Sequence, residues 1–471
     1  MRIKKIIAVL LLLSVVCTFV VGCRDKNGGN ELNKGKVVDD NNTIENGDNS
    51  SNNEYEHDNS WGDRNRCSNN NDKDNNITLH INVTEEDGEI EKENRDEVEN
   101  GIGEDVENII LKNKLTYGLF RDSYVSSKNI LVSPLSVNMA LSMVTNGADG
   151  NTLEELKSVL GCKDVKVMNK KMKEYIGTVD DSKELHIANS VWIKDDNKLK
   201  IKEEFINNLR DSYKSGINRL KFDYSAVNKI NNWVNENTKE MIPEIIEEIK
   251  KEDIMFLINA IAFDAKWEEK YDKDLTRKED FRNIGGDKSK VDMMYSTENR
   301  YIEDDNVTGF IKSYDGGRYE FIALLPDKGV NIDDTINSLS DEKINDYINN
   351  AKTLEVETKM PRFKFEFGIE LNEVLKNMGI KDAFDGIKAN FIKLGEYEGE
   401  NTYIGKVLHK TFVEVDEEGT KAAAVTSIGM VRTTSVNLNE PKKVYLDRPF
   451  IFIIIDKNID IPMFIGSVVK L

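Results

Sequence analysis

The chain of 471 residues carries 85 acidic and 65 basic side chains, which gives a formal net charge of −20 at pH 7. This acidic balance argues against a nucleic acid partner, because phosphate binding needs clustered Lys and Arg side chains. The four cysteines show no disulfide framework, so packing alone must hold the fold: Cys17, Cys23, Cys67 and Cys162.

The first residues have the three parts of a secretory signal. The basic opening MRIKK precedes an apolar run from Ile6 to Val21, and Gly22 stands before Cys23. The end of the run resembles the bacterial lipobox, in which the chain is cut before a cysteine that carries a diacylglycerol. We therefore predict a lipoprotein signal peptide over residues 1–22, lipidation of Cys23 and an extracellular location on the outer face of a bacterial cytoplasmic membrane. An ordinary signal peptide with an incidental cysteine is the alternative.

Residues 23–104 are dominated by Asn, Asp, Glu, Gly and Ser. Such a composition buries too little apolar surface to offset the entropy of ordering, which predicts a disordered acidic spacer. Within it, Ile77, Leu79, Ile81 and Val83 alternate with polar residues, the period of a half-buried strand. The spacer is interpreted as a passive tether, and docking of this short segment on the body, which would slow loss of activity, is the alternative.

The remaining chain, residues 105–471, begins with helical patterns and continues with strands. Apolar spacing predicts helices over 106–124 and through 143, and a capped helix that starts at Asn151. Strands are predicted over 186–193, 256–265, 319–325, 354–360, 411–415 and 449–455, of which 256–265 is almost wholly apolar and therefore central in a sheet. Helices early and strands late, without alternation, predict an α+β domain with large mixed sheets.

Motifs of catalytic chemistry are absent from the sequence. It contains no GxSxG, no HExxH, no phosphate-binding glycine loop and no Cys/His metal spacing. Its four histidines, His57, His80, His186 and His409, are scattered. We therefore expect no enzymatic activity, no catalytic residue, no cofactor and no metal.

One segment carries a specific resemblance. From Phe412 the chain reads as a strand, turns at Gly419, passes through small residues to Thr426, and then enters a Thr/Ser-rich loop. This resembles the serpin hinge, usually E-E-G-T-E-A-A-A-A-T. Further matches follow in family order: ILVSPLS (130–136), NGADGNT (146–152), LINAIAFDAKW (257–267), MPRF (360–363), DRPF (447–450) and FIG (464–466). The chain is identified as a member of the serpin family of serine-protease inhibitors.

The resemblance implies a serpin fold, α+β with large mixed sheets, about eight or nine helices and an exposed reactive-centre loop. It assigns the hinge to Glu417, Glu418, Gly419, Thr420, Lys421, Ala422, Ala423 and Ala424. It assigns the shutter, a hydrogen-bonded cluster where the strands of the main sheet part, to Ser133, Ser136, Asn259 and His409. Trp267 matches the breach, where the loop first enters the sheet.

In this family the cut loop inserts as a central strand of the main sheet, which needs small or apolar side chains at every second position. One alternate set from the hinge carries no charge: Thr420, Ala422, Ala424, Thr426, Ile428 and Met430. Lys421 departs from the family pattern, but on the other face.

Counting from Gly419 by the family's usual spacing predicts the reactive bond at Thr433–Thr434, with Arg432–Thr433 as the alternative. A cut after Thr433 would suit elastase- or subtilisin-like proteases, and one after Arg432 would suit trypsin-like proteases. We therefore expect a monomeric suicide-substrate inhibitor that traps a serine protease covalently, bound to the membrane through its lipid. A non-inhibitory serpin acting as a binding module at the cell surface is the alternative.

Overall fold

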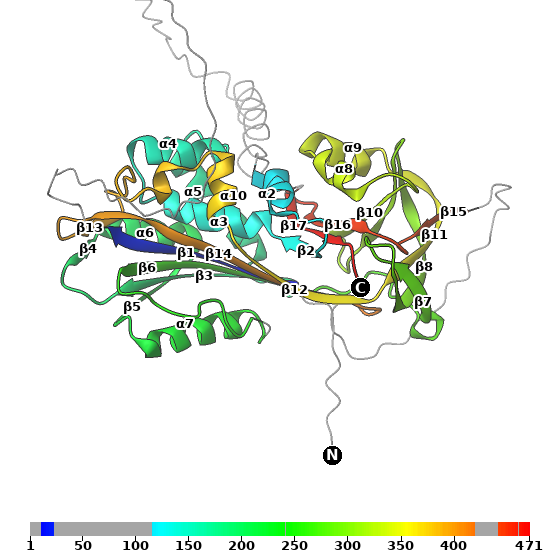
Figure 1. Cartoon of the computed structure of the whole chain (residues 1–471), viewed down its shortest axis with the longest axis horizontal. Helices are drawn as coiled ribbons and strands as arrows, with labels where there is room; N and C mark the ends of the chain where they lie inside the picture. Colours follow the sequence, from blue (N-terminus) through cyan, green and yellow to red (C-terminus); the bar gives the residue numbers. More distant parts are fainter. Residues whose placement is uncertain (1–10, 23–114, 241, 420–440, 460) are drawn as a thin grey trace, which may run out of the picture. The chain divides into compact units, whose positions relative to one another are not determined.

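The computed structural model describes residues 11–22, 115–240, 242–419, 441–459 and 461–471 (Figure 1). Its contacts divide the chain into two units, of which one comprises Met1–Arg24 and Asn100–Leu471 and the other Asp25–Glu99. All described residues belong to the first unit, and the predicted spacer lies outside them.

The first sheet has six strands and contains the segment predicted to be central. Its order is β12 (Phe363–Glu370), β14 (Asn401–Val415), β1 (Leu11–Gly22), β6 (Asp253–Phe263), β3 (Leu185–Lys194) and β5 (Gly216–Leu220). Every residue of β6 is buried, which explains its almost wholly apolar sequence, because both faces of the strand are covered. The prediction of a central strand over 256–265 is confirmed.

The second sheet has nine strands and is antiparallel except for one edge pair, β15 and β11. Its order is β15 (Lys442–Tyr445), β11 (Lys352–Pro361), β8 (Lys288–Glu303), β9 (Val307–Ser313), β10 (Tyr319–Pro326), β16 (Phe450–Asp456), β17 (Ile461–Val468) and β2 (Ile130–Val132), and β7 (Arg277–Arg282) pairs with β8. A third, small sheet joins β13 (Gly395–Tyr397) to β4 (Leu199–Ile201).

Nine α-helices lie in the described part of the chain: α2 (Leu115–Ser123), α3 (Pro134–Thr145), α4 (Gly150–Val159), α5 (Val165–Val179), α6 (Glu203–Tyr213), α7 (Tyr224–Asn237), α8 (Ile332–Asn337), α9 (Asp341–Asn349) and α10 (Asn372–Met378). Helix α3 packs on β1 and β6, and α7 covers the opposite face of the six-stranded sheet (Figure 1). This arrangement confirms the predicted α+β class with large mixed sheets.

Local sequence explains where α3 begins. The Ser133 hydroxyl accepts a hydrogen bond from the Ser136 backbone N–H at 3.0 Å, and Pro134 takes the first helical position, where its missing N–H costs nothing. The predicted cap at Asn151 was wrong. Helix α4 begins at Gly150, and the Asn151 side chain instead donates to Asp382 at 2.6 Å.

The strand β1 was not predicted, because its residues match the apolar core of a signal peptide. An apolar run rich in β-branched residues is also typical of a strand buried on both faces, and periodicity cannot separate the two. Here Val15, Val16, Cys17 and Phe19 expose no surface. The signal peptide and the lipidation of Cys23 stay predictions. In the part of the chain that the structure describes, no helix has the length and apolar character needed to cross a membrane.

Candidate functional site

The predicted hinge begins where β14 ends. After Val415 the chain makes a tight turn in which Asp416 and Gly419 pair as an antiparallel bridge. Gly419 has a φ of +81°, and a Cβ atom at this position would lie 2.1 Å from the Trp267 backbone nitrogen. Only glycine fits both the dihedral angle and the space.

Two glutamates of the turn are held by cations from neighbouring connections between strands, the one between β11 and β12 and the one between β6 and β7. The Arg362 guanidinium donates to both carboxylate oxygens of Glu417 at 2.5 and 2.7 Å, and the Thr276 hydroxyl donates to the same carboxylate at 2.7 Å. Glu418 accepts hydrogen bonds from Lys270 at 2.9 Å and Lys273 at 2.5 Å. These contacts pin the start of the loop to the body.

The three carboxyl groups of the turn differ in their pKa. Burial alone would raise the pKa of Glu417, but hydrogen bonds from Thr276 and Arg362 lower it below its ordinary value. Hydrogen bonds from Lys270 and Lys273 lower the pKa of Glu418. Burial raises the pKa of Asp416 to about 6, helped by the negative charges of Glu417 and Glu414.

The predicted breach residue lies directly beneath this turn. The Trp267 indole N–H donates to the Asp416 carbonyl at 3.0 Å, and its backbone N–H donates to the Glu418 carbonyl at 3.3 Å. The ring stacks on Tyr314 with centroids 4.4 Å apart and planes 16° apart. Trp267 therefore contacts the start of the predicted hinge through both its side chain and its backbone.

The four predicted shutter residues come together from three elements. The Ser133 backbone N–H donates to His409 Nε2 at 3.1 Å, so this nitrogen is the acceptor. The Ser136 hydroxyl donates to the Asn259 carboxamide oxygen. All four side chains are buried.

Sequence reasoning missed one member of this network. Asn189 of β3 accepts a hydrogen bond from Asn259 Nδ2 at 2.8 Å and donates its own amide to the Tyr213 carbonyl at 2.8 Å. Within the strand pattern Asn189 looks like an ordinary polar position. Asn259, which interrupts the apolar stretch of β6 that follows Asp253, was the available signal that a buried partner exists.

Strand β1 passes between the two sides of the shutter. Val15 lies opposite His409 of β14 and opposite Asn259 of β6. The two strands that carry these side chains are therefore separated by one full strand, and His409 and Asn259 are not direct neighbours in the sheet.

Several predicted site residues lie outside the described residues: Thr420, Lys421, Ala422, Ala423, Ala424, Arg432, Thr433, Thr434 and Cys23. Among the residues that are described, no group of three or more His, Cys, Asp or Glu side chains is arranged to hold a metal ion.

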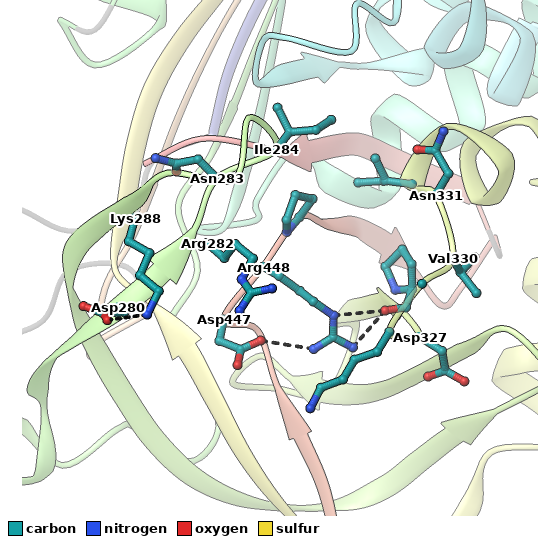
Figure 2. A pocket seen from close by; sticks show the side chains of 16 residues that line it. Asp280, Arg282, Asn283, Ile284, Lys288, Asp327, Val330, Asn331, Asp447 and Arg448 are labelled. Carbon is teal, nitrogen blue, oxygen red and sulfur yellow. Dashed lines mark hydrogen bonds and ion pairs between the residues drawn. The ribbon is translucent and has the colours of Figure 1, made fainter.

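A cavity of about 560 Å³ lies by the turn between β7 and β8, beside the loop that follows β10 and residues 447–449 (Figure 2). The Arg448 guanidinium donates to the Pro326 carbonyl at 2.8 Å and pairs with Asp447 at 3.1 Å. Lys288 pairs with Asp280 at 3.1 Å. Because these charges neutralise one another, they stabilise the wall and we assign the cavity no ligand.

Comparisons with known proteins identify the fold. A family model described as Serpin (serine protease inhibitor) matches residues 111–471. The solved structure of tengpin, a thermophilic serpin, in its native state is similar at 40% sequence identity and a TM-score of 0.71, covering 77% of this chain and 94% of tengpin. Its latent state matches at 40% identity and a TM-score of 0.68, covering 78% and 97%. An uncharacterized serpin-like protein from Methanosarcina acetivorans is 33% identical over 352 residues, which cover 72% of this chain and 81% of the relative.

Proposed function

Because the chain belongs to the serpin family, whose members are generally protease inhibitors rather than enzymes, we propose that it is a suicide-substrate inhibitor of serine proteases. The observation that carries this proposal is the hinge. Arg362 donates a hydrogen bond to Glu417, and Gly419 lies against the backbone of Trp267. From Gly419 the sequence continues into a segment of small residues.

In the proposed mechanism the target protease supplies the chemistry. Its serine hydroxyl attacks the carbonyl carbon of Thr433, an ester forms, and the amine of Thr434 leaves with a proton from the protease histidine. The cut loop then inserts into the six-stranded sheet before water can hydrolyse the ester. A cut after Arg432 is the alternative reactive bond.

The hinge residues support this mechanism by their size. An inserting strand places every second side chain in the core, so a bulky or charged residue there would stop insertion. Ala422 and Ala424 are small and uncharged. Insertion adds backbone hydrogen bonds at ~0.5–1.5 kcal/mol each, and buried apolar area adds to this.

The direct test uses the secreted chain, which lacks the predicted signal peptide over residues 1–22. It is mixed with trypsin, pancreatic elastase and subtilisin, and the products are separated on denaturing gels. A complex that survives SDS, together with a released peptide that begins at Thr434 or Thr433, supports inhibition and identifies the reactive bond by mass spectrometry. Cleavage by all three proteases without any complex would favour the non-inhibitory serpin, which is the second candidate.

We also propose that the chain is a bacterial lipoprotein, anchored at Cys23 to the outer face of the cytoplasmic membrane. The motif Val20-Val21-Gly22-Cys23 supports this location. Expression in a bacterium with labelled fatty acid should label the wild-type chain and leave Cys23→Ser unlabelled. Equal labelling of the two chains would contradict the anchor.

A further inference from the structure

Strand β1 lies in the cleft between β6 and β14 and pairs antiparallel with each of them. Along β14 it extends from Leu12 opposite Phe412 to Gly22 opposite Asn401. The N-terminal segment is thus a central strand of the six-stranded sheet, although residues 23–114 separate it from the next described residue.

The reactive loop would need the same place. Continuing the Asp416–Gly419 pairing along β14 would put Ala423 opposite Phe412, where Leu12 lies. The same register would put Thr434 opposite Asn401, where Gly22 lies. The two segments would run in the same direction and use the same backbone hydrogen-bonding groups of β14, so they exclude each other.

The fit of β1 in the cleft is specific. Phe19 packs edge-on against Phe391 with centroids 5.1 Å apart. Val20 fills the space above Gly405, where an added Cβ would lie 2.8 Å from its Cγ1. Beside that glycine the register with β14 shifts, between Thr18 and Phe19. The contacts therefore depend on these side chains as well as on the backbone.

β1 also fills the cleft with more apolar surface than the loop would. Val15 and Val16, which expose no surface, lie opposite His409 and Leu408. In the register above, Thr426 and Ser427 would take these two positions. Since buried apolar area drives strand insertion, the N-terminal segment is the stronger occupant.

We propose that residues 11–22 act as an intramolecular ligand of the cleft between β6 and β14, and that a chain retaining them in the cleft cannot insert its reactive loop. The chain becomes an inhibitor when this segment leaves, and cutting before Cys23 removes it. This inference rests on the proposed inhibitory function.

Occupancy of the cleft is tested through the Cys17 thiol, which is free and buried. The full chain, produced without export, is treated with iodoacetamide, and alkylation of Cys17 is followed by mass spectrometry with a urea-unfolded sample as reference. Val16→Lys places a charge among the buried side chains and should expel β1, raising the alkylation rate of Cys17 at least tenfold. Val125→Lys, at a side chain that is 48% exposed, is the matched control and should leave Cys17 protected.

The proposed block of loop insertion by β1 is tested by adding the same three proteases to each full chain. Wild type and Val125→Lys should be cleaved without an SDS-stable complex, and Val16→Lys should form one. Val16→Ser, a milder change, serves if the lysine variant does not fold, which circular dichroism will show.

The outcomes separate the two proposals. Alkylation of Cys17 in the folded wild type as fast as in urea would overturn the occupancy. Equal complex formation by wild type and Val16→Lys would overturn the block. If neither a folded Val16 variant with a reactive Cys17 nor the secreted chain formed a complex, both the inhibitory function and the block would be overturned. Protection of Cys17 in the wild type would in that case still support occupancy of the cleft by β1.

Discussion

Gly419 shows how one residue can confine the turn at the start of the predicted hinge. Its backbone is in the left-handed region at a φ of +81°, and the Trp267 backbone nitrogen stands where a side chain would begin. Gly399 has the same φ, but nothing lies within 4 Å of its Cβ position. The two glycines share a conformation and differ in space, so they form a natural matched pair.

We expect Gly399→Ala to lower the free energy of unfolding by about 1 kcal/mol, the cost of a left-handed alanine. Gly419→Ala should lower it by at least ~2 kcal/mol more, because backbone atoms must also move. Urea unfolding of the two variants measures the difference. Equal losses would show that the turn relaxes freely and that Trp267 does not confine it.

Asp416 should make the free energy of unfolding depend on pH. Burial raises its pKa to about 6, above the ordinary 3.8. A carboxyl group with a raised folded-state pKa favours folding below its unfolded pKa, and this contribution is lost as the pH rises through 6. Asp416→Asn removes the cost of ionising a buried group and retains an oxygen for the Glu418 N–H.

The asparagine variant should therefore be more stable than wild type by ~2 kcal/mol at pH 7.5, with little difference near pH 4. Thermal unfolding at the two pH values measures this. Asp211→Asn, on the exposed surface of α6, is the control and should show no such trend. A gain that is the same at both pH values would contradict the assignment of the raised pKa to Asp416.

At the scale of elements, the predicted shutter residues and Asn189 join α3, β3, β6 and β14 through buried hydrogen bonds. Ser136 on α3 donates to Asn259 on β6, and Asn259 donates to Asn189 on β3. Since a buried polar group without a partner is costly, this network couples the helix to the position of the strands. Opening the sheet must keep or replace these bonds.

This coupling is measurable by a double-mutant cycle on Ser136→Ala and Asn259→Ala. Each single change should cost about 1–3 kcal/mol of unfolding free energy, and the double change should cost less than their sum by ~0.5 kcal/mol or more. Asn401→Ala, at the other end of β14 and bonded to Gly386 and Ala389, is the control partner. Additivity in the Ser136–Asn259 cycle would mean that the pair does not act as a unit.

At the scale of the whole molecule, one central position of the six-stranded sheet links the two proposals. β1 fills it in this structure, and the proposed mechanism needs the cut loop to fill it instead. Stability and inhibitory activity are then linked, because any strand that completes the sheet lowers its free energy. In the proposed mechanism, a chain whose central position is already filled would gain no further free energy from loop insertion with which to move a bound protease.

The loop face that must enter the sheet can be tested by adjacent substitutions. Ala422 belongs to the alternate set without charge, and Lys421 to the other. In the secreted chain Ala422→Glu should stall insertion, since it would bury a charge, so proteases cut the loop and escape, and complex yield should fall at least tenfold. Lys421→Glu should retain wild-type yield on the same gels. Equal yields for the two variants would contradict insertion in this register.

The sequence by itself determined the family, the α+β class and the central strand β6, because each follows from motifs or periodicity along the chain. The assignment of single residues to the hinge, the breach and the shutter follows from the resemblance to the family and stays a prediction. Glu417, Gly419 and Asn259 stand out where the pattern of charge or size breaks. Only the tertiary structure revealed the hydrogen bond between Asn189 and Asn259 and the place of residues 11–22 in the sheet. The reason is that an apolar run indicates only that the segment is buried away from water. Whether the run is buried in a membrane or between two strands that are distant in the sequence depends on long-range strand pairing. The periodicity of the run itself does not determine this pairing.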